Sequence, residues 1–302
     1  MKKLLVFAAM TALVAGLVFI ACKKEENKVK KSLIYNGESV LSYTGNTFCF
    51  DENFNNSQNY IGEYHNIIVN QLAKNWNYYE NANLINYNLL NISFNMTEQL
   101  MDINIIDYDI DKDSLIDNLN LAFFESFDTN ETFINNVKLE FISMNAYFEN
   151  FFVDIDTFLY GDLTIEERLN HMLYVEQKVY NSTMSNETKD WYLVFCAVLK
   201  YSMQNLITIA ENSSHPFYYY LINEPQQKGL ISNVKTFIHD HASEIVSDAC
   251  GAVKWGRRGA QVGAVGGPGC TIAMGALGAV AGGALTTATT IAAVEGVKQI
   301  CK

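Results

Sequence analysis

Apolar residues recur at helical spacing through most of the chain. Over residues 59–79, one helical face carries Ile61, Tyr64, Ile68 and Leu72, three or four residues apart, as expected for an amphipathic helix. Further apolar faces at this spacing cover residues 114–127, 129–160, 191–210 and 230–249. Several helices joined by short loops predict an all-α protein with a bundle-like helical body.

Two of these helices have recognisable start signals. Thr164 and Glu167 have the spacing of a capping box, which predicts a helix from there to about Asn181. Ser185 or Asn186 is a suitable cap for the next helix. Residues 32–57 lack this periodicity, and the only regular element expected there is a short strand at 39–43.

The pattern changes in the last fifty residues, where Gly and Ala dominate. Twelve of the eighteen glycines lie at or beyond Gly251. Many recur one helical turn apart, and five are predicted helix-packing positions: Gly259, Gly263, Gly267, Gly278 and Gly282. Each glycine costs an exposed helix ~1 kcal/mol relative to Ala, so this spacing indicates a flat face that a second helix approaches closely.

A turn signal divides this segment in two. The sequence Gly-Gly-Pro-Gly at 266–269 predicts a chain reversal between helices at 244–265 and 270–298. The second arm has 25 uncharged residues from 270 to 294, ~37 Å as a helix and enough to cross a ~30 Å bilayer core. Only seven of them are large and apolar, which favours insertion by only ~2–4 kcal/mol. The arm therefore requires a partner helix, either in lipid or inside a protein.

The N-terminus reads as a secretory signal. Lys2 and Lys3 precede an apolar run from Leu4 to Ile20. The end of this run and the next two residues, Phe19-Ile20-Ala21-Cys22, resemble the lipobox of bacterial lipoproteins, with Phe where that family prefers Leu. The resemblance implies cleavage before Cys22 and acylation of its sulfur. The alternatives are an uncleaved membrane anchor and a plain secretory signal with an incidental cysteine.

The residues after Cys22 bear on location. Lys23-Lys24-Glu25-Glu26 resembles the export signal of Bacteroidetes lipoproteins that reach the outer face of the outer membrane. The alternative is a solvated charged linker. We therefore expect an outer-membrane lipoprotein of the bacterial cell envelope, exposed on the cell surface if the export signal holds.

Two further resemblances concern the mature chain. The motif from Tyr60 to Asn66, together with the C-terminal Gly/Ala-rich segment, resembles a group of uncharacterised Bacteroidetes lipoproteins, from which no activity follows. The last fifty residues alone resemble the glycine-zipper helix pairs of bacteriocin-like peptides, which permeabilise membranes.

These features divide the chain into four parts. Residues 1–21 are the expected signal peptide, and 22–57 a lipidated linker with an irregular segment. Residues 58–243 form the helical body and 244–302 the glycine-zipper hairpin. The hairpin is expected to pack on the body, on itself, on another copy of the chain, or on a membrane.

Charge is divided unevenly along the chain. The net charge is −12, but residues 251–302 hold five cations against Glu295 alone, so residues 1–250 carry −16. An acidic body argues against nucleic acid as a partner. The basic tail can dock on the acidic body or on an anionic membrane.

Five cysteines remain besides Cys22. Cys196 lies in an apolar helical run and is expected to be a buried thiol. If the chain between Cys250 and Cys270 is helical, these two lie ~30 Å apart and cannot form a disulfide. The pairing of Cys49 and Cys301 stays open.

Candidate chemistry is sparse. His241 and Glu244 share a helical face but His239 does not, which leaves two ligands where a metal site needs at least three. Glu167 and His171 lack a matching second pair, and the alternating aspartates at 107–113 lack the glycine and glutamate of a calcium loop. No catalytic residue, cofactor or metal is predicted.

Three functions follow in order of preference. The first is a lipid-anchored envelope protein without catalysis. The second is a membrane-active, toxin-like protein whose tail inserts into a bilayer. The third is an envelope hydrolase with a dispersed site around His65, His171 or the pair His239 and His241.

Overall fold

The computed structural model describes residues 54–76, 87–103, 148–222 and 234–300, together with positions 105, 110, 115–116 and 141. The α-helices in these parts are Asn59–Lys74 (α2), Tyr87–Met101 (α4), Phe148–Tyr160 (α7), Ile165–Tyr180 (α8), Asn186–Glu211 (α9), Tyr218–Leu221 (α10), Val234–Asp240 (α11), Ala242–Gly263 (α12) and Pro268–Ile300 (α13), with one 3-10 turn at Ala264–Gly266 (η2). The described residues contain no strand, and the predicted all-α class is confirmed.

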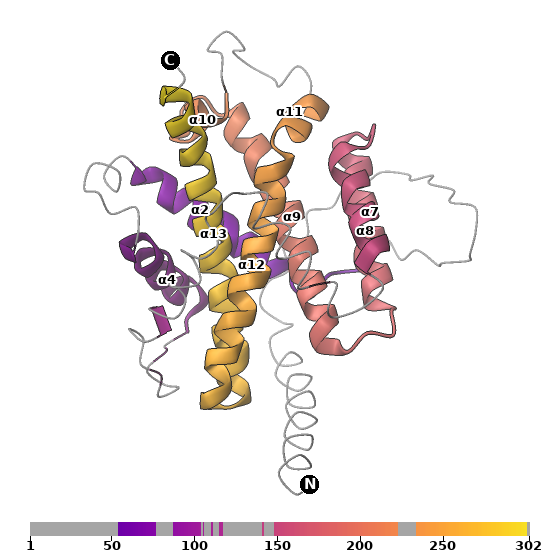
Figure 1. The fold of residues 1–302 in the computed structure, drawn as a ribbon, viewed down its shortest axis with the longest axis vertical. Helices are drawn as coiled ribbons and strands as arrows, with labels where there is room; N and C mark the ends of the chain where they lie inside the picture. The colour runs from indigo at the N-terminus through magenta and orange to yellow at the C-terminus, as the bar shows by residue number, and fades with distance from the viewer. Residues whose placement is uncertain are drawn as a thin grey trace, which may run out of the picture.

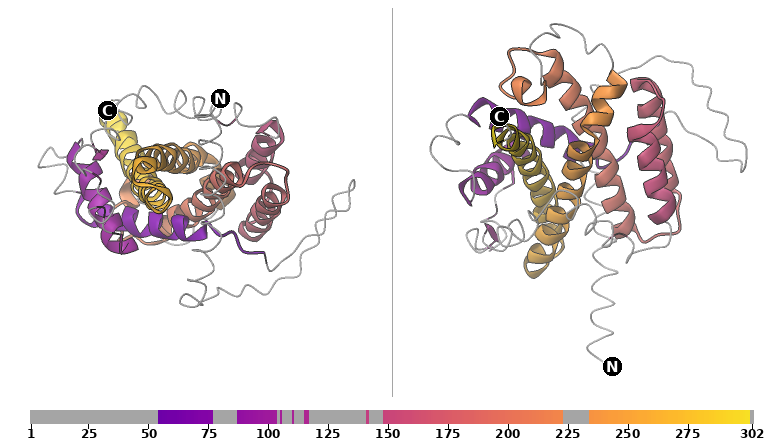
Figure 2. Two further views of the ribbon diagram at one scale, coloured as in Figure 1. Left: turned by 90° about the horizontal axis from the view of Figure 1, so that it is seen from below. Right: turned by 45° about the horizontal axis from the view of Figure 1, so that its top comes forward.

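The C-terminal hairpin occupies the middle of the molecule. Helices α12 and α13 run side by side in opposite directions, and α2, α4 and α9 pack around them (Figure 1). Helices α7 and α8 lie beyond α9, on the side away from α13 (Figure 2). The Gly/Ala-rich segment is therefore the central layer of the bundle, enclosed by amphipathic helices.

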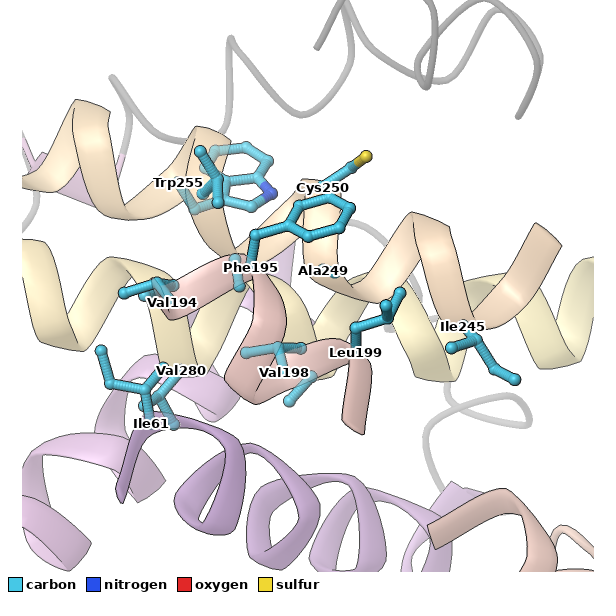
Figure 3. Close-up of a cluster of buried hydrophobic side chains, with 14 of the residues drawn as sticks. Ile61, Val194, Phe195, Val198, Leu199, Ile245, Ala249, Cys250, Trp255 and Val280 are labelled. Atoms are coloured by element: carbon cyan, nitrogen blue, oxygen red, sulfur yellow. The ribbon is translucent and has the colours of Figure 1, made fainter. Parts of the chain in front are cut away.

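The main core forms where four helices meet. Figure 3 shows Ile61 of α2, Phe195 and Val198 of α9, Ile245 of α12 and Val280 of α13 gathered in one apolar cluster. Each of these side chains is at most 3% exposed. This burial is the main source of stability, since each such side chain contributes ~1.5–3 kcal/mol when removed from water.

The predicted helix starts are confirmed. In α8 the Thr164 hydroxyl accepts a hydrogen bond from the Glu167 amide at 3.2 Å, and the Thr164 amide donates to the Glu167 carboxylate at 2.7 Å. In α9 the Ser185 hydroxyl accepts from the Thr188 amide at 3.2 Å. The predicted face of α2 is also buried, with Ile61, Ile68 and Leu72 against the core.

The helix predicted over 230–249 is wrong as a single element. Helix α11 ends at Asp240, and α12 begins at Ala242 after His241, whose φ and ψ are −108° and 16°. Ser243 and His241 both bond the carboxylate of Glu244 in the first turn of α12. An acidic residue in a first turn interacts favourably with the helix dipole, so local chemistry supports a new start at this point.

Helix α4 is not among the elements predicted from the sequence. Its buried contact face includes Ser93 and Thr97 as well as Leu89, Leu90 and Phe94. The Ser93 hydroxyl donates to the Ala281 carbonyl of α13 at 3.0 Å. Small polar residues suit a helix that packs on an Ala-rich neighbour, but they weaken the apolar periodicity that a sequence displays.

Several sequence predictions lie outside the described residues. They are the signal peptide, Cys22, the segment Lys23–Glu26, the strand at 39–43, Cys49, the four aspartates at 107–113, most of the helix at 114–127, all of 129–147 except position 141, and Cys301.

Candidate functional site

Glycine lets the two arms of the hairpin approach at backbone distance. A Cβ atom on Gly263 would lie 2.6 Å from the Cys270 carbonyl oxygen, and one on Gly259 would overlap the Met274 carbonyl. From the other arm, a Cβ on Gly278 would overlap the Trp255 carbonyl oxygen, and one on Gly282 would overlap the Trp255 side chain. These four positions have no room for a side chain.

Gly267 does not take part in this contact. It lies in the turn between η2 and α13 with φ of 93°, and a Cβ there would meet no atom within 4 Å. Positive φ is costly for residues with a side chain, so this glycine serves the chain reversal. Pro268 follows as the first residue of α13, a position where its fixed φ suits a helix.

Further glycines complete the two faces. Gly256 and Gly275 extend them, and a Cβ on Gly256 would lie 2.7 Å from the Trp191 ring of α9. Both arms then carry the same spacing of three and four residues: Gly256, Gly259, Gly263 and Gly275, Gly278, Gly282. A search for that helical spacing, instead of a strict four-residue repeat, finds all six positions.

A buried polar cluster lies at the other end of the hairpin from the turn. It consists of His65 from α2, Ser202 from α9, Asp248 from α12 and Thr287 from α13. His65 Nε2 lies 3.0 Å from the Thr287 hydroxyl, and the Ser202 hydroxyl donates to Asp248 Oδ2. Each of the four side chains is at most 1% exposed. One residue from each helix thus joins all four helices.

Glycine also makes room for this cluster. A Cβ on Gly283 would lie 3.0 Å from the His65 ring. Beside the cluster, one on Gly251 would lie 2.5 Å from the hydroxyl of Thr286, the neighbour of Thr287. His65 Nδ1 lies 3.0 Å from the Asn66 side-chain oxygen. The imidazole is therefore held at both nitrogens against a flat part of α13.

Burial shifts the pKa values of the two titratable side chains of the cluster in opposite directions. It lowers the pKa of His65 to about 4, because a buried imidazole is penalised in its charged form. It raises the pKa of Asp248 to about 8, and the hydroxyls of Ser202 and Thr287 offset only part of that effect. At neutral pH both groups are predominantly uncharged in the folded protein.

The cluster cannot act on a substrate in this conformation. A general acid or base must reach the reacting atom within hydrogen-bonding distance, and none of the four side chains reaches the surface. A neutral carboxyl and a neutral imidazole instead lower the cost of burying polar atoms at a four-helix junction. The arrangement is suited to fixing the hairpin in the bundle.

A buried ion pair fixes the outer helices. Glu176 of α8 is fully buried and lies 3.1 Å from Lys200 Nζ of α9. Asn56, which precedes α2, donates to the same carboxylate at 2.7 Å and to the Leu193 carbonyl at 2.9 Å. The network joins the chain before α2 to both α8 and α9.

The structure places the candidate metal ligands apart. His241 Nδ1 lies 3.4 Å from Glu244, whereas His239 is exposed and lies 3.5 Å from Asp240. His171 Nε2 lies 2.9 Å from the Asp154 carbonyl oxygen. Within the described parts of the chain, no three His, Cys, Asp or Glu side chains gather as a metal site would need.

The described cysteines are buried. Cys196 is a free thiol in α9, as expected, and burial raises its pKa well above the usual value. Cys270 is also a free thiol at the start of α13. A Cys250–Cys270 disulfide is therefore not formed. The chain does reverse between the two residues, but α12 continues to Gly263 before it does so.

A cavity of about 180 Å³ opens between α7, α8 and α11, lined by Leu159, Tyr160, Arg168, Lys235, Thr236 and His239. The Arg168 guanidinium donates to the Phe158 and Gly161 carbonyls at the end of α7. Lys235 pairs with Asp162 at 2.5 Å. The two cationic side chains that line the cavity thus already bond other groups of the protein. This indicates a structural crevice between helices and not a binding site.

Two described helices are long and apolar enough to cross a membrane: α9 and the part of α13 at Pro268–Ala288. In their most apolar windows, 78% and 83% of the residues are buried inside the protein. Core helices of a water-soluble domain meet the same criterion, so length and composition alone do not place either helix in lipid.

No protein-family model, curated protein or solved structure matches the chain.

Proposed function

We propose that the protein is a lipid-anchored component of the bacterial cell envelope with a non-catalytic role. Its acylated N-terminus holds an all-α body at the outer membrane, and the glycine-packed hairpin is the central element of that body. The close backbone contact of α12 and α13 inside the bundle is the observation that best supports this role for the hairpin.

The N-terminal sequence supports the anchor. A basic start and an apolar run are features of a secretory signal, and the small residue directly before Cys22 fits the lipobox that this segment resembles. Two acyl chains suffice to hold a domain stably on a bilayer, where one chain is marginal. The segment Lys23–Glu26 supports display on the outer face of the outer membrane, since it directly follows Cys22 as in the export signal that it resembles.

The anchor is tested with a fatty-acid probe in growing cells. The wild-type chain should incorporate the probe and remain with the membrane fraction. Cys22→Ala should lose the label and leave that fraction as a soluble or secreted species. Cys49→Ala serves as the matched control and should keep the label. A labelled Cys22→Ala protein would refute the proposed acylation site.

A second candidate function is insertion of the hairpin into a target bilayer. The observation that favours it is the length and apolar character of α13 beside a helix that supplies its partner. In this function the helices that surround the hairpin, α2, α4 and α9, would separate from it when the protein contacts a membrane. Dye leakage from vesicles containing the full chain tests it: leakage supports insertion, and intact vesicles at saturating protein support the non-catalytic body.

A further inference from the structure

The closed end of the hairpin extends beyond the other described helices. In Figure 1 the turn between α12 and α13 lies below the ends of α8 and α9, and Figure 2 shows the same protrusion from a second angle. Val265 in this turn is 94% exposed, and Ile272 in the second turn of α13 is 41% exposed. The tip is thus both prominent and apolar.

Exposed aliphatic residues are concentrated at this tip. Elsewhere in the described chain the exposed large hydrophobic residues are Val153 and four tyrosines, Tyr60, Tyr160, Tyr180 and Tyr219. A tyrosine keeps its hydroxyl in water, whereas an exposed valine or isoleucine has no polar atom to solvate. Of the three exposed aliphatic side chains among the described residues, two therefore lie at this tip, one in η2 and one near the start of α13.

Cationic side chains lie about two to three helical turns before Val265. Lys254, Arg257 and Arg258 are half-buried on α12, and Arg258 lies about 10 Å along the helix from Val265. No acidic residue occurs between Asp248 and Glu295. Residues 249–294 therefore hold three cations and no acidic residue, whereas residues 1–250 carry a net charge of −16.

We propose that the tip of the hairpin docks on the surface of an anionic lipid bilayer. Val265 and Ile272 enter the boundary between headgroups and acyl chains, while Arg257 and Arg258 meet the lipid phosphates. Short apolar side chains ahead of long cationic ones match that order of layers, because Arg extends its charged end toward the headgroups. The body remains folded and outside the hydrocarbon.

This docking rests on the membrane location proposed above, but not on acylation. It gives the protein a second contact with lipid, 243 residues after Cys22 in the sequence. A domain held by its N-terminus alone can turn freely on its linker. A second contact would hold it in one orientation, with the hairpin axis directed at the bilayer.

The test introduces a tryptophan at the tip of the full chain. Val265→Trp is mixed with vesicles that contain brominated acyl chains, which quench indoles only on contact. We expect quenching with phosphatidylglycerol in phosphatidylcholine, and little with phosphatidylcholine alone. Val153→Trp, at an exposed position of α7, is the matched control and should show no quenching above the native tryptophans in either vesicle.

Charge is tested in the same assay. Arg257→Gln with Arg258→Gln should weaken docking of the Val265→Trp chain by up to about 30-fold, at about fivefold per cation. Lys235→Gln on α11 is the control and should leave the quenching unchanged. Circular dichroism and the unfolding midpoint confirm that each variant is folded.

Two results would overturn the proposal. The first is equal quenching at positions 153 and 265, or none at 265, with anionic vesicles. The second is quenching at 265 that does not depend on phosphatidylglycerol or on the two arginines. Acylation is read separately through the fatty-acid probe on Cys22, so failure of the anchor and failure of the tip are distinguishable.

Discussion

At the scale of single residues, the protein buries two titratable side chains where four helices meet. His65 and Asp248 are fully buried, and their pKa values move to about 4 and about 8. Their effects on stability have opposite signs. Protonation of His65 opposes folding as pH falls from 6.5 toward 4, and ionisation of Asp248 opposes folding as pH rises from 4 toward 8.

Asp248→Asn should therefore remove the alkaline part of this dependence. The folded pKa of Asp248 is raised, so its favourable contribution is complete below pH 4 and is lost as pH rises to about 8. The wild-type protein should lose up to about 1.4 kcal/mol of stability per pH unit across that range relative to the variant. Denaturant unfolding at pH 5, 6.5 and 8.5 measures the difference.

Asp240→Asn is the control for this measurement, because Asp240 is an exposed carboxylate at the end of α11. The stability of the Asp240→Asn variant should change with pH in the same way as the stability of the wild type. A constant offset between Asp248→Asn and wild type at all three pH values would contradict the assignment of a raised pKa to Asp248.

A second prediction at this scale concerns the buried ion pair. Lys200→Met leaves the Glu176 carboxylate fully buried without its cation, and losing one partner of a buried pair costs about 3–5 kcal/mol. We expect a loss at the lower end, because Lys200 is 15% exposed. The double variant Glu176→Gln, Lys200→Met should recover most of this stability. An equally unstable double variant would show that the charge is not responsible.

At the scale of helices, the hairpin depends on missing side chains. Leu at Gly263 or Gly278 would overlap a carbonyl of the facing arm. Gly263→Leu with Gly278→Leu should destabilise the protein by more than about 3 kcal/mol, because overpacking against backbone exceeds the usual cost in a core. We expect this destabilisation even though Leu has a higher helix propensity than Gly. Thermal unfolding measures the change.

Ala264→Leu is the matched control, since Ala264 is exposed in η2. It should alter stability by no more than about 0.5 kcal/mol. A double glycine variant that is more stable than wild type would refute the close backbone contact. Flotation with vesicles adds a second reading, because a solitary membrane span would gain affinity for lipid from two leucines.

The elements differ in how far the sequence predicts them. The hairpin follows from local signals, namely the glycine spacing on both arms and the turn signal at 266–269. In the structure α12 ends at Gly263 and α13 begins at Pro268, each two residues before the predicted position. The start of α8 follows from Thr164 and Glu167 in the same way. The break at His241 does not, because apolar spacing continues across it.

The buried cluster has no local signal at all. His65 and Thr287 are 222 residues apart in sequence, and Ser202 and Asp248 are 46 apart. No spacing rule joins such residues, because the packing of four helices brings them together. The sequence predicts which helices need a close partner, and only the packed bundle shows which polar side chains share its centre.

At the scale of the whole molecule, the order of the layers determines how the hairpin can meet a membrane. Helix α13 is covered by α2, α4 and α12, and its residues from 276 to 288 are buried. Exposing it to lipid requires those helices to separate, which means breaking the core that Figure 3 shows. Its tip, in contrast, is already exposed.

Hydrogen exchange should therefore distinguish docking from insertion. Without lipid, amides at 276–288 should exchange at the rate set by global unfolding, because they lie at the centre of the bundle. Helices α10 and α11 at the edge should exchange sooner. On adding anionic vesicles, we expect slower exchange at 262–272 only, with the remaining helices unchanged.

The contrasting result is equally specific. If the hairpin enters the bilayer as a unit, α2 and α4 must leave it, and their amides should lose protection when vesicles are added. The Ser93 hydrogen bond to Ala281 and the His65 contact with Thr287 would be lost in the same step. Loss of protection in α2 and α4 would thus establish insertion, whereas protection confined to the tip requires a body that stays folded beside the membrane.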